Sequence, residues 1–391
     1  MRSWTLPTAV FLSFGAGLAQ DATPPPAKNY LNLSLDGLLA VGGSTEPDID
    51  GLQLGGHDPA QRGFTLQNLE VVFEGAVDPY FRGQANVILQ ITPDGETNVE
   101  LEEAFATTSS LPANLQVKAG QYLTEFGRIN TSHPHVWDFV DQPIVSARMF
   151  GGDGLRSVGA RLSWLMPTPF YSELFLAVQN ARGETLTSFG AVEGDTAFGR
   201  PIVGSDVAGA GDLLVTPRWA GSFELTDNQT LLVGASSASG PNGTGADGKT
   251  RIDGVDAFWK WKSATAQKGF PFVKVQAEGM WRTYDAAATE TLPAESFRDH
   301  GAYVQVLWGF KPGWVVGARV DAAGGDDGGA ALEEPALDER SRYSLVATWY
   351  PTEYSKLRLQ YSRDDRSAYA DAHTVWAQFE FLLGAHAAHK F

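Results

Sequence analysis

The chain has 391 residues, no cysteine and a formal net charge of −17 at pH 7. The lack of cysteine excludes a disulfide framework, a thiolate metal site and a cysteine nucleophile. The acidic charge disfavours nucleic acid as a ligand, because phosphate binding needs a basic face. A cysteine-free secreted chain fits a bacterial periplasm or outer membrane, where large proteins need no disulfides.

Residues 1–19 have the pattern of a secretory signal peptide. An apolar run follows a positively charged start, and small residues precede an expected cleavage after Ala19. The alternative is an ordinary buried N-terminal helix. We expect residues 20–29, which contain DATPPPAK, to be a linker, and residues 30–391 to form one domain.

Apolar and polar side chains alternate with a period of two through most of this domain. FRGQANVILQI (81–91) shows the pattern, and KLRLQYSR, VKVQAEGMW and VWAQFEFLL repeat it. The period predicts strands with one apolar and one polar face. We count about sixteen such runs, most of about 9–13 residues, a length that suits strands crossing a bilayer at a tilt. Their centres lie near residues 36, 70, 86, 102, 118, 160, 175, 219, 233, 257, 277, 305, 317, 346, 359 and 379.

Short and long connections mostly alternate between these runs. The short ones are VDPY, TSSLPA, MPTP, TDNQ, KPG and PTEY. The long ones fall near 43–62, 124–154, 181–211, 238–250, 284–298, 322–340 and 364–373. Tight periplasmic turns and long external loops produce this asymmetry in outer-membrane barrels.

The polarity of the two faces separates a membrane barrel from a soluble β-sandwich. The polar faces carry many long charged side chains, which suit a water-filled lumen, and aromatic residues gather at strand ends as in an interfacial girdle. We therefore expect an all-β fold, a transmembrane antiparallel β-barrel of about sixteen strands in the cell outer membrane. The residues expected to face the lumen are Arg82, Lys118, Arg161, Glu173, Arg218, Lys274, Glu278, Lys356 and Arg358.

The stretch FGRINTSHPHVWDFVDQPIV fits neither a helical period nor strand alternation. Strand parity makes 124–154 the third external loop. This loop carries four large aromatic residues, which a loop in water would not need, and it ends in GGDG. We expect it to fold into the barrel and narrow it. The residues expected to line or brace the constriction are Arg128, His133, His135, Asp138 and Asp141.

His133 and His135 are separated by one residue, so in an extended segment both imidazoles face one way. They could share a zinc or copper ion, with Asp138 or Asp141 completing the shell. The alternative is that both histidines hydrogen-bond the barrel wall and brace the loop. His386 and His389 form a second candidate pair near the chain end.

Catalytic signatures are missing from the sequence. It contains no nucleophile elbow, no HExxH motif and no glycine-rich phosphate fingerprint. We therefore expect neither an enzyme nor a cofactor, zinc at the histidines excepted. The chain ends in Phe391, which shares the parity of the outward face. A C-terminal aromatic residue on an amphipathic last strand resembles the signal that the outer-membrane assembly machinery reads.

Four segments carry a resemblance to a known family: RGFTLQNLEVVFEGAVDPYFRGQANV, EFGRINTSHPHVWDFVDQP, GGDGLRSVGARLSWLMPTPFYSEL and FLLGAHAAHKF. The chain resembles Gram-negative outer-membrane porins of the sixteen-stranded, phosphate-selective-porin-like group. More closely, it resembles uncharacterised barrels labelled zinc-regulated outer-membrane receptors. The resemblance implies contact with outer-membrane lipid and lipopolysaccharide, and it allows a homotrimer. Phosphate selectivity is not implied, because residues 124–154 contain no lysine.

The sequence thus predicts a porin that passes small hydrophilic solutes or ions by diffusion, with residues 124–154 as its constriction. A rival hypothesis is a zinc-binding or receptor-type barrel with little conductance. A third is a structural or adhesive barrel. An open pore predicts conductance without metal, whereas a metal receptor predicts zinc binding that disappears when His133 and His135 are replaced by alanine.

Overall fold

The computed structural model describes residues 31–204, 207–326, 337–367 and 369–384. The expected signal peptide and linker, the His386 and His389 pair and Phe391 lie outside these residues. Sixteen strands of the described chain close into one antiparallel barrel. They are β1 (Asn32–Ser44), β2 (Gly63–Ala76), β3 (Phe81–Ile91), β4 (Thr97–Thr108), β5 (Leu115–Leu123), β6 (Arg156–Leu165), β7 (Tyr171–Asn180), β10 (Leu213–Thr226), β11 (Gln229–Pro241), β12 (Lys249–Gln267), β13 (Phe270–Ala286), β14 (Glu295–Lys311), β15 (Trp314–Asp326), β16 (Arg340–Thr352), β17 (Ser355–Arg366) and β18 (Ala372–Gly384).

Barrel strands pair with their neighbours in the chain, and β1 pairs with β18 to close the sheet. Every one of the sixteen expected strand centres falls inside one of these strands. Smaller elements lie in the long connections: α1 (Ile49–Leu52), η2 (Pro134–Val136), α2 (Ile144–Phe150), β8 (Thr196–Ala197), β9 (Arg200–Pro201) and η3 (Ala210–Asp212). A further short helix, η1 (Pro112–Asn114), lies in the turn between β4 and β5. None of the helices in the described part of the chain is long and apolar enough to span a membrane.

The two faces of the barrel wall differ in polarity, as β17 illustrates. Leu357 and Leu359 point outward and are exposed, whereas Lys356 and Arg358 point inward and are buried. An apolar outer face and a polar inner face are what lipid outside and water inside select. The predicted all-β transmembrane barrel is confirmed.

The longest strands, β12, β13 and β14, have 19, 17 and 17 residues, which is longer than expected. The loop ends of β13 and β14 are covered from the inside by the connection that contains β8 and β9. Phe198 of this connection stacks on Phe297 with ring centroids 4.8 Å apart, and it packs against Tyr284 at 4.6 Å with the two rings tilted by 52°. Because this packing buries the inner face beyond the expected ends, the alternation and the strands continue.

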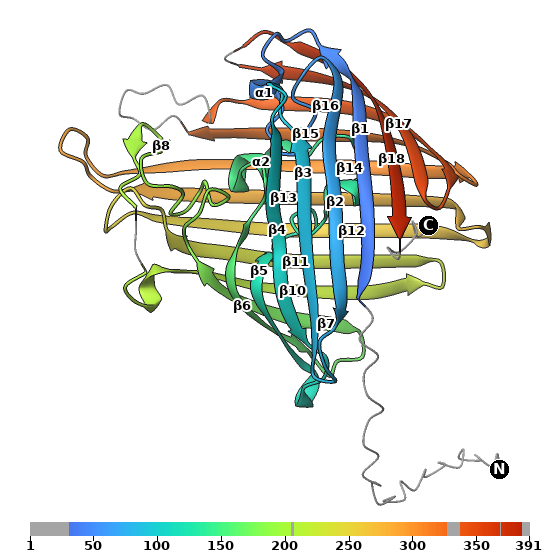
Figure 1. Cartoon of the computed structure of the whole chain (residues 1–391), viewed down its shortest axis with the longest axis horizontal. Coiled ribbons are helices and arrows are strands. Elements are labelled where there is room, and N and C mark those ends of the chain that lie inside the picture. Colours follow the sequence, from blue (N-terminus) through green and yellow to red (C-terminus); the bar gives the residue numbers. More distant parts are fainter. Residues whose placement is uncertain (1–30, 205–206, 327–336, 368, 385–391) are drawn as a thin grey trace, which may run out of the picture.

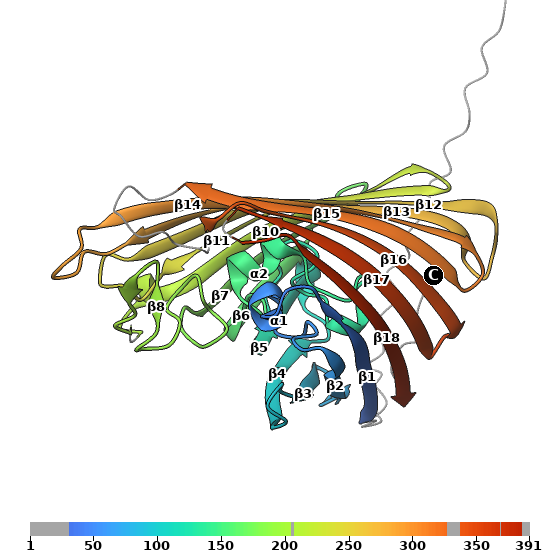
Figure 2. The same cartoon turned by 90° about the horizontal axis from the view of Figure 1, so that it is seen from above.

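The long connections gather at one end of the barrel and the tight turns at the other (Figure 1). Seen from above, α1 and α2 lie on the concave side of the curved sheet (Figure 2). The connections that carry these two helices are loop 1, residues 45–62 between β1 and β2, and loop 3, residues 124–155 between β5 and β6.

Candidate functional site

Loop 3 shares a hydrophobic core with the barrel wall. Its four large aromatic side chains are all buried: Phe126, Trp137, Phe139 and Phe150. Phe126 and Phe150 meet edge to face with ring centroids 5.0 Å apart, and they cluster with wall residues Ile252 and Met280. These apolar contacts therefore hold loop 3 against the barrel wall.

The start of loop 3 is held by Glu278 of β13. Its carboxylate accepts hydrogen bonds from the backbone N–H groups of Arg128 and Ile129, at 2.9 and 2.8 Å, and from the Tyr303 hydroxyl at 2.6 Å. The Arg128 guanidinium lies over the Phe258 ring, 4.5 Å from its centre. Glu278, which was expected to face the lumen, thus holds the backbone of Arg128, which was expected at the constriction.

Asp138 and Asp141 bind cations of the barrel wall. Asp138 Oδ1 lies 2.6 Å from Lys274 Nζ. Asp141 accepts hydrogen bonds from Arg319 at 2.7 Å and Arg342 at 2.6 Å. Burial would raise the pKa of Asp141, but the two guanidinium groups outweigh burial and hold that pKa below its usual range. Both aspartates brace the loop.

Lys356 and Arg358 of β17 hold the middle of loop 3 by its backbone. Lys356 donates a hydrogen bond to the carbonyl oxygen of His135 and pairs with Glu380 at 2.5 Å. Arg358 donates to the carbonyl oxygens of Trp137 and Phe139, at 2.5 and 3.0 Å. These two lumen cations therefore have partners in the protein.

Lys118 and Arg161 meet loop 3 at the opposite side of the barrel from β17. Both contact Glu125, at 2.9 and 3.2 Å. Glu125 is the second residue after β5, so these two wall cations hold the beginning of the loop.

The remaining residues expected to face the lumen differ in exposure. Arg218 pairs with Asp256 at 2.6 Å and is buried. Glu173 is half-buried and accepts a hydrogen bond from the Tyr171 hydroxyl. Arg82 is exposed. Arg82 and Glu173 are therefore better placed than Arg218 to act on a solute.

His133 is surrounded by glutamates of the barrel wall. Its Nδ1 lies 2.7 Å from Glu102 Oε2 and 3.4 Å from Glu70 Oε1, while its Nε2 lies 3.1 Å from Glu103 Oε2. Among the described residues, these three glutamates are the carboxylates recorded in contact with His133. Asp138 and Asp141, which the sequence suggested as partners, are bonded to wall cations instead.

His135 and His57 flank this arrangement. The rings of His135 and His133 are nearly parallel with centroids 5.8 Å apart. Contrary to the expectation from the sequence, the segment is not extended, because Pro134–Val136 form the short helix η2. His135 Nδ1 lies 3.0 Å from Glu70 Oε2. His57 of loop 1 places Nε2 3.6 Å from Glu102 Oε1. Two loops and two strands therefore contribute to one buried group of histidines and glutamates.

The negative field of this group acts on His133 and His57. Burial opposes protonation of His133, but the carboxylates of Glu102 and Glu70 outweigh burial and raise the pKa of His133 well above its ordinary value. The pKa of His57 is raised in the same way, against burial, by Glu102 and Asp153. The group therefore attracts positive charge, as a proton or as a bound cation.

A β-bulge brings two consecutive glutamates to the inner face of β4. Asn86 faces Glu103 and Val87 faces Leu101, so Glu102 has no residue opposite. The extra residue turns both Glu102 and Glu103 inward, and both are buried. Bulges re-aim side chains in this way next to functional sites. The EE doublet inside an alternating strand is the one signal by which the sequence could have pointed to Glu102 and Glu103.

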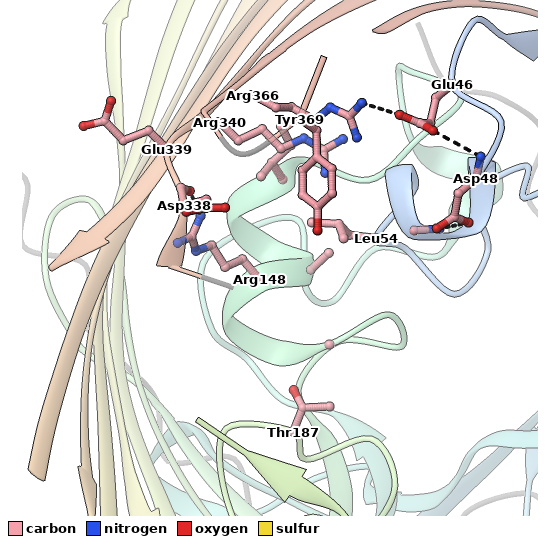
Figure 3. A pocket seen from close by; sticks show the side chains of 14 residues that line it. Glu46, Asp48, Leu54, Arg148, Thr187, Asp338, Glu339, Arg340, Arg366 and Tyr369 are labelled. Carbon is pink, nitrogen blue, oxygen red and sulfur yellow. Dashed lines mark hydrogen bonds and ion pairs between the residues drawn. The ribbon is translucent and has the colours of Figure 1, made fainter. Parts of the chain in front are cut away.

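A cavity of about 530 Å³ opens on the loop side of the barrel (Figure 3). Ile144, Ala147 and Arg148 of α2 line it from loop 3, and Arg340 and Arg366 line it from the wall. Arg148 donates a hydrogen bond to the Asp338 carbonyl oxygen, and Arg366 pairs with Glu46 of loop 1. The cavity thus borders loop 3 at α2 and is lined by several charged side chains.

Comparison with known proteins finds a relative by sequence and barrels of the same fold. No protein-family model matches the chain. An uncharacterized protein of Aquifex aeolicus (strain VF5) is 31% identical over 373 residues, which are 86% of this chain and 73% of that protein.

Solved structures of porins have the same fold. The outer-membrane channel DcaP of Acinetobacter baumannii superposes with a TM-score of 0.59 at 13% identity, covering 94% of this chain and all (100%) of that one. An anion-selective porin from Comamonas acidovorans gives 0.57 at 10% identity, with 91% and 100% covered. The trimer form of OmpT from Vibrio cholerae gives 0.53 at 7% identity, with 91% and 99% covered. At these identities the likeness is one of fold.

Proposed function

The chain belongs to the same family as the uncharacterized protein of Aquifex aeolicus, and from its porin barrel in the outer membrane we propose that it lets small hydrophilic solutes or ions diffuse passively, with loop 3 as the constriction. The observation that carries this proposal is the closed barrel whose inner wall bears charged side chains and whose outer wall is apolar. The neighbouring structures support a channel role. The proposal names no particular solute.

The solute path is proposed to run along the wall that loop 3 leaves free. Inward-facing side chains of β14 to β18 are mostly buried, among them Arg319 and Arg358. In contrast, Arg82 of β3, Gln116 of β5 and Glu224 of β10 face inward and stay exposed. Solutes would therefore enter at the cavity beside α2 and leave past these three exposed residues.

Further partners are proposals of the same kind. We propose a homotrimer, because the trimer form of OmpT has a related barrel. Outer-membrane lipid and lipopolysaccharide would surround the apolar outer face, and the assembly machinery would read Phe391. Membership of the phosphate-selective-porin-like group, and the zinc-regulated receptor label, remain predictions.

Single-channel recording in a planar bilayer tests the proposal. We expect steady conductance steps from the refolded protein without added metal. A variant in which residues 131–141 are replaced by a short glycine-serine linker should conduct severalfold more and admit larger sugars in liposome swelling. The control is a similar replacement of residues 288–294, which lie in the connection between β13 and β14 and should leave conductance unchanged.

Two results would contradict the proposal. A folded wild-type barrel without conductance would favour the receptor-type alternative. An unchanged conductance after replacement of residues 131–141 would remove loop 3 from its role as the constriction.

A further inference from the structure

The buried group of histidines and glutamates contains a potential ion site. One ligand atom each from Glu70, Glu102 and His133 lies within 4.8 Å of the other two. The three residues come from β2, β4 and loop 3. We propose that they bind a divalent first-row transition-metal ion, which fastens loop 3 to the barrel wall. This site is separate from the proposed solute path, and it does not depend on conductance.

The arrangement of atoms around His133 fits a metal ligand. Its Nε2 faces Glu103 Oε2 at 3.1 Å, so a proton on Nε2 leaves the lone pair of Nδ1 directed at Glu102 and Glu70. Metal-binding histidines in proteins commonly donate the other ring N–H to a carboxylate in this way, which fixes the tautomer. His133 is thus oriented by Glu103 toward the two remaining glutamates.

The spacing of the ligand atoms also suits an ion. Metal–ligand bonds of about 2.0–2.2 Å place tetrahedral ligand atoms roughly 3.3 Å apart. Nδ1 of His133 lies 3.4 Å from Glu70 Oε1, which matches this spacing, and 2.7 Å from Glu102 Oε2. The Glu102 oxygen would therefore move away by roughly 0.6 Å when an ion binds. Yet Nδ1 and Glu102 Oε2 are buried without a hydrogen-bond partner in the described structure. An ion bound between these atoms would give each of them the partner that it lacks.

The charge of the site calls for a cation. Glu70, Glu102 and Glu103 are each buried. Their recorded partners are histidines, the Asn86 amide and the N–H of Leu123. Across the described ranges, no salt bridge joins any of the three to lysine or arginine, whereas the single carboxylate of Asp141 has two arginines. Buried carboxylates are normally paired or bound to metal.

The backbone is built to present these ligands. The bulge in β4 gives Glu102 no residue opposite and turns it inward beside Glu103. A second register shift, in the pairing of β1 with β2, leaves Gln67 without a residue opposite, three residues before Glu70. Side chains around the ligands are fixed as well, since His135 Nδ1 lies 3.0 Å from Glu70 Oε2. Such supporting contacts orient metal ligands.

The donor set selects the class of ion. Mg²⁺ and Ca²⁺ prefer oxygen ligands throughout, whereas one imidazole with two carboxylates is a donor set for zinc and its neighbours. Three protein ligands leave one coordination position open. Because the ion would join β2, β4 and loop 3, we expect it to reduce the motion of the loop.

Zinc binding to the full-length, refolded protein tests this inference. After treatment with a chelator, we expect isothermal titration to give one Zn²⁺ per chain, and excess Mg²⁺ or Ca²⁺ not to compete. Co²⁺ should give visible absorption bands of a four- or five-coordinate site. Glu102→Gln keeps the size of the side chain and should weaken zinc binding roughly 10- to 100-fold or more, with His133→Ala as the second variant.

Matched controls separate this site from others. Glu224→Gln on β10 and His300→Ala on β14 change the same residue types at exposed positions and should bind zinc as the wild type does. Heat-dependent gel mobility establishes that each barrel is folded. Zinc binding that survives Glu102→Gln in a folded barrel, or that disappears when residues 385–391 are removed, would overturn the proposal. If the wild type binds no zinc, the proposal also fails, and the histidines and glutamates are then a hydrogen-bonded network without an ion.

Discussion

Arg319 of β15 and Asp141 of loop 3 are 178 positions apart in the sequence, yet Arg319 Nη2 donates a hydrogen bond to Asp141 Oδ1 at 2.7 Å. The other carboxylate oxygen of Asp141 accepts from Arg342 at 2.6 Å. One buried carboxylate thus bridges two buried guanidinium groups, which also pair with Asp321 and Asp364. Removing one partner of such a pair is costly, because the remaining charge stays buried.

Asp141→Asn should therefore destabilise the barrel by about 3–5 kcal/mol. Urea unfolding in detergent micelles, followed by tryptophan fluorescence, measures the change. Asp253→Asn is the matched control, since Asp253 pairs with Arg251 on the exposed surface. That pair should contribute less than about 1 kcal/mol. Equal effects of the two variants would mean that Asp141 does not hold loop 3.

Asp58 of loop 1 should make the contact between loops 1 and 3 depend on pH. Burial and the negative charge of Asp141 raise the pKa of Asp58 to about 7 from an ordinary value of 3.8. The folded state then binds more protons than the unfolded state between about pH 4 and 7, so stability falls as pH rises through this window. Asp58 also accepts a hydrogen bond from the N–H of Gln142.

Hydrogen exchange at Gln142 measures this dependence. We expect slower amide exchange at pH 5 than at pH 8, after correction for the intrinsic rate. Asp58→Asn should remove the difference. A difference that persists in Asp58→Asn would assign the pH dependence to another group.

Leu359→Arg should show where lipid contacts the wall. Leu359 is 56% exposed on the outer face of β17, and an arginine near the bilayer midplane of a barrel costs about 2–4 kcal/mol. Leu111→Arg, in the turn between β4 and β5, should cost at most about 1 kcal/mol because it lies near the interface. Equilibrium folding into lipid vesicles provides both numbers. If the two substitutions cost the same free energy of folding, Leu359 would not lie deeper in the bilayer than Leu111.

Arg82→Glu should shift the ion preference of the pore. The side chain of Arg82 is exposed on the inner wall, and fixed charges along a pore select ions of opposite sign. We expect the reversal potential in a salt gradient to move toward cation selectivity, more at low salt than at high salt. Arg251→Glu makes the same charge change on an outward-facing, exposed residue. A shift of equal size in Arg251→Glu would remove Arg82 from the solute path.

The strands could be predicted from the sequence because lipid and water impose opposite polarity on alternate residues. This signal is local, so each expected centre lies within a strand. The loop ends of β13 and β14 could not be predicted. Tyr284 and Ala286 of β13 and Phe297 of β14 are buried together with Phe198, and that packing depends on a connection distant in the sequence.

The candidate site was only partly accessible to sequence reasoning. The spacing of His133 and His135 singled them out. Their carboxylate partners Glu70, Glu102 and Glu103 are set by strand register and by a bulge, neither of which a single sequence displays. Proximity along the chain favoured Asp138 and Asp141 as partners, but tertiary contacts with arginine and lysine determine where those aspartates lie.

The bonds between loop 3 and the last strands also order the assembly of the barrel. Loop 3 follows β5, but Arg319, Arg342 and Arg358 belong to β15, β16 and β17. Contacts between such distant segments form late, because the intervening chain must first be placed. We expect loop 3 to dock only when the barrel is nearly closed. A chain that stalls before β15 would leave Phe139 of loop 3 without Val315 and Val346, two of the wall residues that bury it, and we expect such an unfinished barrel to be cut more readily by proteases in this part of the loop.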